Sequence, residues 1–282
     1  MEPADKSWQQ ELEERMLQID PRNLNGVIDT DPQRAREQGC FGTIYKGIYN
    51  NRKVCVKVVG GFSRSFEHLI REMRVWCQLT HPHIVQLYGW ISYIKEDFRP
   101  SLVSNWCDGG NVRGFLERHP NADRRALIYG IAHGVEYLHS EDVVHGDITP
   151  ANVVMNGNIP QLCDFGTSFL IWDTTTRPGP TVVGYGMVLR YTAPEVTVGE
   201  SGSTKESDVW GFGCTAMEIL RNEQPYSTTT ILVDMHNPAA LAQSKPPFTP
   251  PSTQTEKTLA PCLEFNPKNR IDMGTVIVSL NG

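Results

Sequence analysis

The fold of this chain follows from the stretch His145-Gly146-Asp147-Ile148-Thr149-Pro150-Ala151-Asn152 together with the shorter stretch Asp164-Phe165-Gly166. Apolar residues 153–155 lie between them and predict a short buried strand after the first stretch. Two aspartates and one asparagine therefore stand on two turns that can face one bound molecule. Either stretch alone is a common turn, so the interpretation rests on their order and spacing.

These polar side chains suit phosphoryl transfer, which asks a protein for positioned metal ions, a positioned hydroxyl and a shielded γ-phosphate. The two stretches resemble the catalytic loop and the Asp-Phe-Gly turn of eukaryotic protein kinases. The resemblance implies that Asp147 orients the acceptor hydroxyl and takes its proton. It also implies that Asn152 and Asp164 hold Mg²⁺ against the phosphates of ATP through hard oxygen ligands, and that His145 packs on Phe165.

The C-terminal half extends the resemblance to about residues 37–280. Ala193-Pro194-Glu195 matches the end of an activation segment, and residues 208–213 match a buried helix whose aspartate braces the catalytic loop. Arg270 is expected to pair with Glu195. Residues 71–76 and 189–195 look most like tyrosine-kinase-like Ser/Thr kinases of the fungal type.

A glycine-rich loop and a buried lysine point to the nucleotide. Glycines let backbone amides approach phosphates closely, and the resemblance assigns this role to the loop of Gly39, Gly42 and Ile44, although Glu37 stands where the family has its first glycine. Lys57 lies in an apolar strand, so its charge needs a partner, and Glu72 on the next helix can supply it. The remaining residues implied to line the ATP pocket are Cys55, Lys57, Ser104, Asn105, Cys107, Val154 and Asp164.

Three residues of the C-terminal half depart from the family pattern. Gly146 replaces an arginine that clamps phosphorylated activation loops, so control by such phosphorylation is not expected. Thr149 replaces a lysine that steadies the γ-phosphate, and Val188 replaces a threonine of the same network. Reduced activity and complete inactivity both remain open.

The order of expected elements predicts an α+β, two-lobed protein-kinase-like fold, with a small β-rich lobe before a larger helical one. Helices are expected at 8–19, 65–79, 126–140, 208–220 and 274–280, a hairpin at 38–59, strands at 84–94 and 101–105, and loops at 20–32 and 237–255. The expected domains are an N-terminal extension with a short helix (1–36), the N-lobe (37–103), the hinge (104–110) and the C-lobe (111–282).

Composition limits the compartment and the partners. The net charge of −6 gives no sign of a nucleic-acid partner, and no apolar run is long enough to span a membrane. Residues 1–10 lack the apolar stretch of a signal peptide, and seven scattered cysteines predict free thiols in a reducing, cytoplasmic compartment. The His81-Pro82-His83 pair has no further ligands at zinc spacing and is expected to be structural.

Three functions compete. The first is an ATP- and Mg²⁺-dependent kinase that phosphorylates Ser or Thr of a protein substrate, and Pro150 argues mildly against a tyrosine acceptor. The second is a pseudokinase that serves as an ATP-binding or scaffolding module, motivated by Glu37, Thr149 and Val188. The third is a small-molecule phosphotransferase, in which residues 193–195, 208–213 and Arg270 are not expected. The protein substrate and the oligomeric state stay open.

Overall fold

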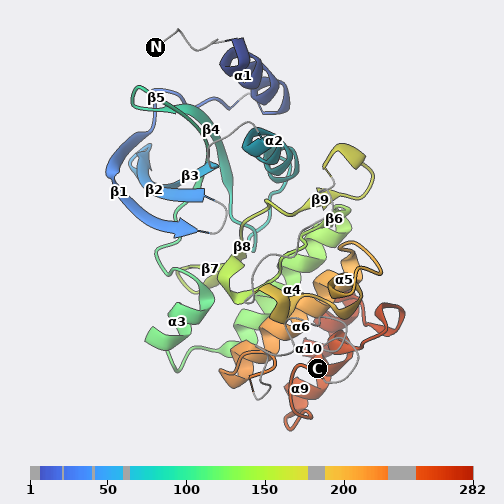
Figure 1. Ribbon diagram of the computed structural model, residues 1–282. Helices are drawn as coiled ribbons and strands as arrows, with labels where there is room; N and C mark the ends of the chain where they lie inside the picture. The colour runs from blue at the N-terminus through green and yellow to red at the C-terminus, as the bar shows by residue number, and fades with distance from the viewer. Residues whose placement is uncertain are drawn as a thin grey trace. The chain divides into compact units, whose positions relative to one another are not determined.

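The computed structural model describes residues 7–20, 22–39, 42–59, 64–176, 188–227 and 246–281. These fall into two compact units: the first holds residues 1–81 and 85–106, the second 82–84 and 107–282 (Figure 1). The chain passes from the first to the second between Trp106 and Cys107, inside the segment predicted as a hinge. The exact domain boundaries given above stay predictions.

The first unit is a five-stranded sheet with two helices. All strand pairs are antiparallel, and the strand order is β1-β2-β3-β5-β4. The elements are α1 (Ser7–Ile19), β1 (Asp29–Gly39), β2 (Gly42–Tyr49), β3 (Arg52–Val59), α2 (Arg64–Trp76), β4 (Leu87–Ile94) and β5 (Asp97–Asn105). The α+β fold class and the β-rich first half are thereby confirmed.

The predicted hairpin is confirmed, and the strand before it is a finding that the sequence did not predict. Asn50 and Asn51 join β2 to β3 with φ of 47° and 62°, a left-handed conformation that asparagine tolerates better than most residues. The segment 20–32 was expected to be a loop, but β1 already begins at Asp29. Its sequence is mostly polar and lacks alternation, as an edge strand allows.

The two faces of this sheet bury different residues. One face carries a hydrophobic core cluster of Leu24, Tyr45, Val54, Val56, Ile91, Ile94 and Val103. Because side chains alternate along a strand, Cys55 and Lys57 of β3 point to the opposite face. The register pairs Lys57 with Ile44 on β2 and Cys55 with Ser104 on β5, so these four residues share that opposite face.

The second unit is mainly helical. It contains α3 (Val112–Arg118), α4 (Arg124–Ser140), β6 (Val143–Val144), β7 (Val153–Asn156), β8 (Ile159–Leu162), β9 (Phe169–Leu170), α5 (Pro194–Thr197), α6 (Lys205–Arg221), α9 (Gln254–Leu259) and α10 (Met273–Asn281). Asp123 caps α4, and Thr204 begins α6 with a capping box. The helices expected near 126, 208 and 274 are confirmed, and α6 is buried over most of its length.

Of the predicted loop at 237–255, residues 237–245 lie outside the described residues, and residues 246–253 carry no helix or strand, as predicted. Its last residues, 254 and 255, belong to α9, because Thr253 and Glu256 form a capping box that starts the helix.

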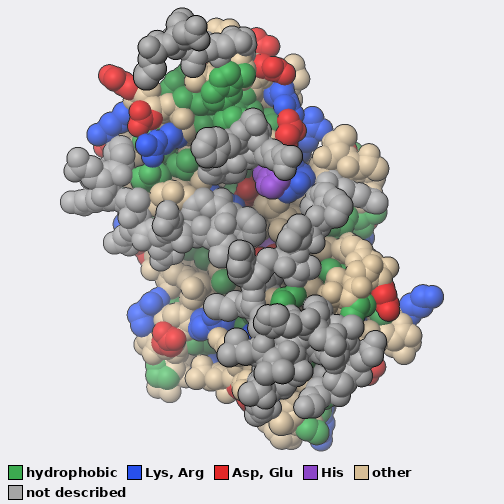
Figure 2. All heavy atoms as spheres, viewed as in Figure 1, with side chains coloured by type: hydrophobic (Ala, Val, Ile, Leu, Met, Phe, Trp, Pro, Cys, Tyr) green, Lys and Arg blue, Asp and Glu red, His purple; other side chains and the backbone are tan. Residues whose placement is uncertain are grey.

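Within the described residues, no helix is both long and apolar enough to cross a membrane. The same part of the chain brings no three His, Cys, Asp or Glu side chains together in a group fit for a metal ion. On the face drawn in Figure 2, acidic and basic side chains are interspersed.

Candidate active site

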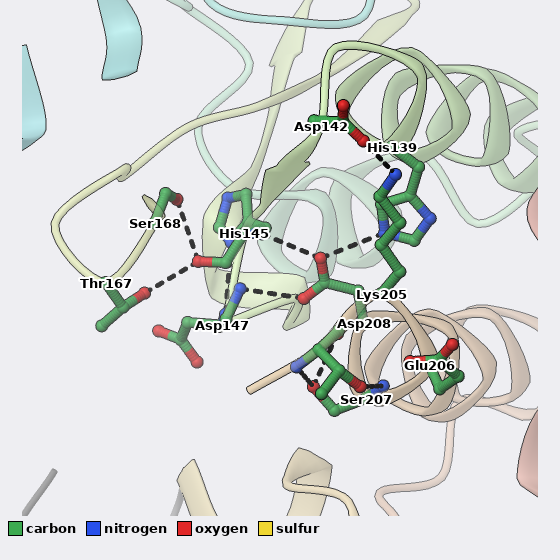
Figure 3. A network of polar contacts seen from close by, with 12 residues as sticks. His139, Asp142, His145, Asp147, Thr167, Ser168, Lys205, Glu206, Ser207 and Asp208 are labelled. Atoms are coloured by element: carbon green, nitrogen blue, oxygen red, sulfur yellow. Dashed lines mark hydrogen bonds and ion pairs between the residues drawn. The ribbon is translucent and has the colours of Figure 1, made fainter. Parts of the chain in front are cut away.

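The carboxylate of Asp208 on α6 organises the loop that holds Asp147. It accepts the backbone N–H of His145 at 2.8 Å through one oxygen and that of Gly146 at 2.8 Å through the other. His139 of α4 contacts the same carboxylate at 3.2 Å (Figure 3). Asp208 is only 2% exposed, and charge-assisted bonds in such a setting are strong. The predicted bracing by this aspartate is confirmed.

His145 is fully buried, and each of its polar groups has a partner. Its Nδ1 accepts the N–H of Asp147 at 3.3 Å, and its Nε2 lies 3.2 Å from the Cys163 carbonyl. A proton on Nε2 satisfies both contacts. The His145 carbonyl accepts the hydroxyls of Thr167 at 3.0 Å and Ser168 at 2.9 Å. These two hydroxyls were not predicted, since nothing in the sequence links them to a residue so distant.

The side chains of Asn152 and Asp147 are joined directly. Asn152 Nδ2 donates to Asp147 Oδ2 at 2.7 Å and to the Asp147 carbonyl at 2.9 Å. Asn152 ends a 3₁₀ turn (Pro150–Asn152), and its carbonyl accepts the N–H of Cys163, the residue before Asp164. Both bonds to Asp147 are donated by the amide nitrogen of Asn152, so its amide oxygen, Oδ1, points away from Asp147.

Asp164 begins its turn in a left-handed conformation, with φ of 66°. Its carboxylate accepts the N–H of Gly166 at 3.4 Å. Phe165 is fully buried, and its ring lies 5.3 Å from the ring of His145. The predicted packing of these two rings is confirmed, and it fixes the turn against the loop that carries Asp147.

Burial is the main influence on the charge of Asp147. It raises the pKa of the carboxyl above its ordinary value of 3.8, and the nearby carboxylates of Asp164 and Asp208 act in the same direction. The bond from Asn152 and the proximity of His145 oppose the rise. A raised pKa makes Asp147 a better proton acceptor.

In the first unit, Lys57 and Glu72 form the predicted ion pair. Lys57 Nζ lies 2.7 Å from Glu72 Oε1, and the side chains are 12% and 3% exposed. Removing one partner of such a buried pair leaves an uncompensated charge and typically costs about 3–5 kcal/mol. Lys57 shares its face of the sheet with three further residues predicted to line the pocket, namely Ile44, Cys55 and Ser104.

The other predicted pocket residues divide between the two units. Gly39 and Gly42 face each other as the last pair of the β1–β2 ladder. The N–H of Asn105 donates to the Gln86 carbonyl at 3.0 Å. In the second unit, Cys107 contacts the side chain of Gln161, which is the register partner of Val154. Each unit therefore brings its own members of the predicted pocket together.

The departures from the family pattern have distinct surroundings. Gly146 has φ of 79°, a left-handed conformation that glycine adopts without a steric penalty. Thr149 is 6% exposed and its carbonyl accepts the N–H of Asn152. The side chains of Glu37 and Val188 are outside the described part of the chain. The backbone of Glu37 lies in β1, and that of Val188 begins a short 3₁₀ turn (Val188–Tyr191).

Two buried polar networks support the second unit. Arg270 grips Glu195 with both Nη atoms at 2.6 Å, as predicted. The other network was not predicted: Arg113 donates to Glu218 at 2.8 Å and to the Tyr191 hydroxyl at 2.9 Å, and that hydroxyl donates to Glu218 at 2.5 Å. Its members lie on α3, α6 and the turn before α5, so sequence spacing gave no signal.

A small pocket lies beside Asp147. It is lined by Asp147 and Ile148, by Tyr191 and Ala193 from the segment before α5, and by Ser203. Gly146 and, from α6, Asp208 and Gly211 also line it, so the pocket lies between the loop of Asp147 and α6.

Comparison with known proteins agrees with this fold and geometry. The family described as protein tyrosine and serine/threonine kinase matches residues 33–280. The chain belongs to this family, whose members generally use ATP and Mg²⁺.

Among curated relatives, the dual specificity protein kinase splA of Dictyostelium discoideum is 27% identical over 86% of this chain and 11% of its own length. The serine/threonine-protein kinase dst4 of the same organism is 30% identical over 80% of this chain and 45% of its own. The mitogen-activated protein kinase kinase kinase zak-1 of Caenorhabditis elegans is 25% identical over 86% of this chain and 34% of its own. The chain thus spans less than half of each of these relatives.

Proposed function

We propose that this chain is an ATP- and Mg²⁺-dependent kinase that transfers the γ-phosphate to a Ser or Thr hydroxyl of a protein substrate. The observation that carries the proposal is the bond between Asn152 and Asp147, which aims one carboxylate while leaving the amide oxygen available. In this proposal Asp147 takes the proton of the acceptor hydroxyl while that oxygen bonds to the γ-phosphorus. The bond from the γ-phosphorus to the β–γ bridging oxygen breaks, and ADP leaves.

The donor atoms fit the metal that the family uses. Mg²⁺ prefers oxygen ligands and keeps several waters, and Asn152 Oδ1 with the Asp164 carboxylate offers two such ligands on neighbouring turns. Bound there, Mg²⁺ would neutralise charge on the phosphates. The left-handed conformation of Asp164 and the buried ring of Phe165 would hold the second ligand in place.

The residues of the first unit are assigned to ATP. Lys57, oriented by Glu72, would bind the α- and β-phosphates, and the backbone around Gly39 and Gly42 would cover them. The remaining pocket residues are assigned to the adenine, with Ile44, Cys55 and Val154 against its faces and the backbone of Asn105 and Cys107 at its edge. Ser104, at the back of that pocket, would leave it open.

Ser or Thr is proposed as the acceptor because the loop contains Pro150, where tyrosine kinases usually have a different sequence. The relatives' printed names cover serine/threonine, dual-specificity and tyrosine kinases. The acceptor is therefore to be read from the phosphorylated residues themselves.

A pseudokinase is the second candidate, favoured by Glu37, Thr149 and Val188. Thr149 lies within the loop that holds Asp147 and is buried, so its short side chain cannot replace a lysine that reaches the γ-phosphate. A small-molecule phosphotransferase is disfavoured, since the Arg270–Glu195 pair belongs to the protein-kinase pattern.

The experiment incubates the chain with Mg-ATP and a mixed protein acceptor, and phosphorylated residues are mapped by mass spectrometry. Asp147→Asn should lower the rate about 10²–10⁴-fold, the usual contribution of a general base. Asp142→Asn is the matched control, because this aspartate is 58% exposed and pairs only with Lys205 at the surface in the described residues. Equal background signal from parent and Asp147→Asn would favour the pseudokinase.

A further inference from the structure

We propose that helix α1 is a positioning element for the Lys57–Glu72 ion pair and acts through α2. The inference rests on the proposed function in so far as that pair serves phosphate transfer. It concerns residues outside the family match, which begins at residue 33. α1 and α2 pack together within the first unit (Figure 1).

An aromatic contact joins the N-terminal turn of α1 to the first turn of α2. The Trp8 ring stacks on Phe66 with centroids 5.2 Å apart and an interplanar angle of 30°. It also meets the edge of Phe98 on β5 at 5.1 Å and 85°. Aromatic pairs in these geometries stabilise packing beyond the apolar area that they bury. One indole therefore touches both α2 and the sheet that carries Lys57.

The middle of α1 adds an apolar and an ionic contact. Leu12 and Met16, one turn apart, are 4% and 0% exposed. Arg15 binds Glu67 with two parallel bonds, 2.7 Å and 2.9 Å long. This bond lowers the pKa of Glu67, so the pair stays ionised at neutral pH. The planar fork of arginine fixes geometry as well as distance.

The C-terminal end of α1 is fixed to the sheet. The Asp20 carbonyl accepts the indole N–H of Trp90 on β4 at 2.8 Å, and the Asp20 carboxylate binds Arg22, whose guanidinium also reaches the Leu87 carbonyl at 3.1 Å. Leu24 then donates its N–H to the Trp90 carbonyl at 2.8 Å. α1 is thus anchored on β4 at one end and on α2 at the other.

These anchors bear on Glu72 because α2 is one continuous helix from Arg64 to Trp76. Phe66 and Glu67 lie in its first two turns, and Glu72 follows little more than one turn later. A helix moves as a rigid element, so a displacement of its first turns changes the place of the Glu72 carboxylate. The buried 2.7 Å bond to Lys57 depends on that place.

Charge exchange tests the proposal. Arg15→Glu and Glu67→Arg each replace an attraction by a repulsion, and the double variant restores it with the ends reversed. We expect hydrogen–deuterium exchange in residues 64–76 to rise about threefold to tenfold in each single variant, as for surface ion pairs of this kind. We expect kcat to fall by a similar factor with the protein KM unchanged, and the double variant to recover both.

Glu14→Lys is the matched control, since it makes the same charge change as Glu67→Arg at an exposed position of α1. Trp8→Ala is a second, uncharged variant and should raise α2 exchange in the same way. Unchanged α2 exchange in both single variants and in Trp8→Ala would overturn the proposal. Faster exchange without a change in kcat would also overturn it, because α1 would then stabilise α2 without positioning Glu72.

The same proteins separate this inference from the proposed function. If the parent chain transfers no phosphate, the proposed function fails, and α2 exchange in the four charge variants still decides whether α1 holds α2. If the parent is active and the double variant restores neither exchange nor kcat, the proposed function stands and the role of α1 fails.

Discussion

The side-chain amide of Asn152 donates to the carboxylate of Asp147 at 2.7 Å, so Asn152 orients that carboxylate. Asn152 ends a 3₁₀ turn that begins three residues after Asp147. Their contact fixes the geometry of the loop. It also makes the chemistry of either residue depend on its neighbour.

Asn152→Asp should nearly abolish phosphoryl transfer. The new carboxylate would face that of Asp147 across a hydrogen-bond distance, and two such groups cannot both be ionised at low cost. We expect kcat/KM to fall at least about 10²-fold, measured by initial rates with Mg-ATP. Asn156→Asp makes the same change at the exposed end of β7 and should leave kcat/KM within about twofold. A fully active Asn152→Asp enzyme would contradict the proposed roles.

As the pH is lowered, kcat/KM should fall with a midpoint above the pKa of an ordinary aspartate. Burial raises the pKa of Asp147 above 3.8, so the proton acceptor is lost at a higher pH than for an exposed aspartate. The same shift means that the folded chain binds this proton more tightly than the unfolded chain. Its contribution to stability is therefore present at low pH and lost as the pH rises through the folded-state pKa.

The measurement is kcat/KM against pH, together with urea unfolding of the parent and Asp147→Asn at several pH values. The difference in unfolding free energy between the two should change with pH in the acidic range. An acid limb with its midpoint at or below the ordinary aspartate value of 3.8 would refute the raised pKa.

Gly89→Ala should destabilise the first unit severely. Gly89 has φ of 150°, and a Cβ there would lie 2.2 Å from the backbone carbonyl oxygen of Arg22. The clash is with backbone, so relief requires breaking the pairing between residues 22–24 and β4. We expect a loss of about 2–4 kcal/mol and a melting temperature about 5–10 °C lower. Gly202→Ala is the control, because open space surrounds it, and scanning calorimetry compares them.

Tyr191→Phe should destabilise the second unit by about 1–3 kcal/mol, since it leaves the buried Glu218 and the partly buried Arg113 with one hydrogen bond fewer each. Burial, together with the bond to Glu218, raises the pKa of the Tyr191 hydroxyl, so the group donates throughout the accessible pH range. Urea unfolding gives the measurement. Tyr93→Phe on the exposed side of β4 serves as the control, and an equal loss in both variants would argue against the network.

Sequence reasoning predicted the parts of the site whose partners are close in the chain or carry a strong motif. Asp147, Asn152 and Asp164 belong to two short turns. Because Lys57 lies on an apolar strand, its charge needs an acidic partner, and Glu72 on the next helix was the candidate. Helices were predicted correctly where apolar residues recur with a clear helical period, as in α4 and α6. These predictions used local propensity and the cost of buried charge, both of which act over short stretches.

The remainder could not be predicted because it depends on contacts between distant segments. β1 is mostly polar and acquires its strand structure from pairing with β2. Arg113, Tyr191 and Glu218 are each ordinary residues until the fold brings α3, α6 and the turn before α5 together. The helix at 8–19 was expected, but its contact with Glu67 through Arg15 depends on the packing of two helices that the sequence does not place.

The pairing of residues 22–24 with β4 has a practical consequence for work with recombinant fragments. The family match begins at residue 33, and a fragment cut there would lose the partners of the Trp90 amide and carbonyl as well as α1. That cut would expose the edge of β4 as a template for strand pairing between molecules. Such a fragment is expected to associate and precipitate where the longer chain does not, so a cloning boundary copied from the family match is a poor choice for this protein.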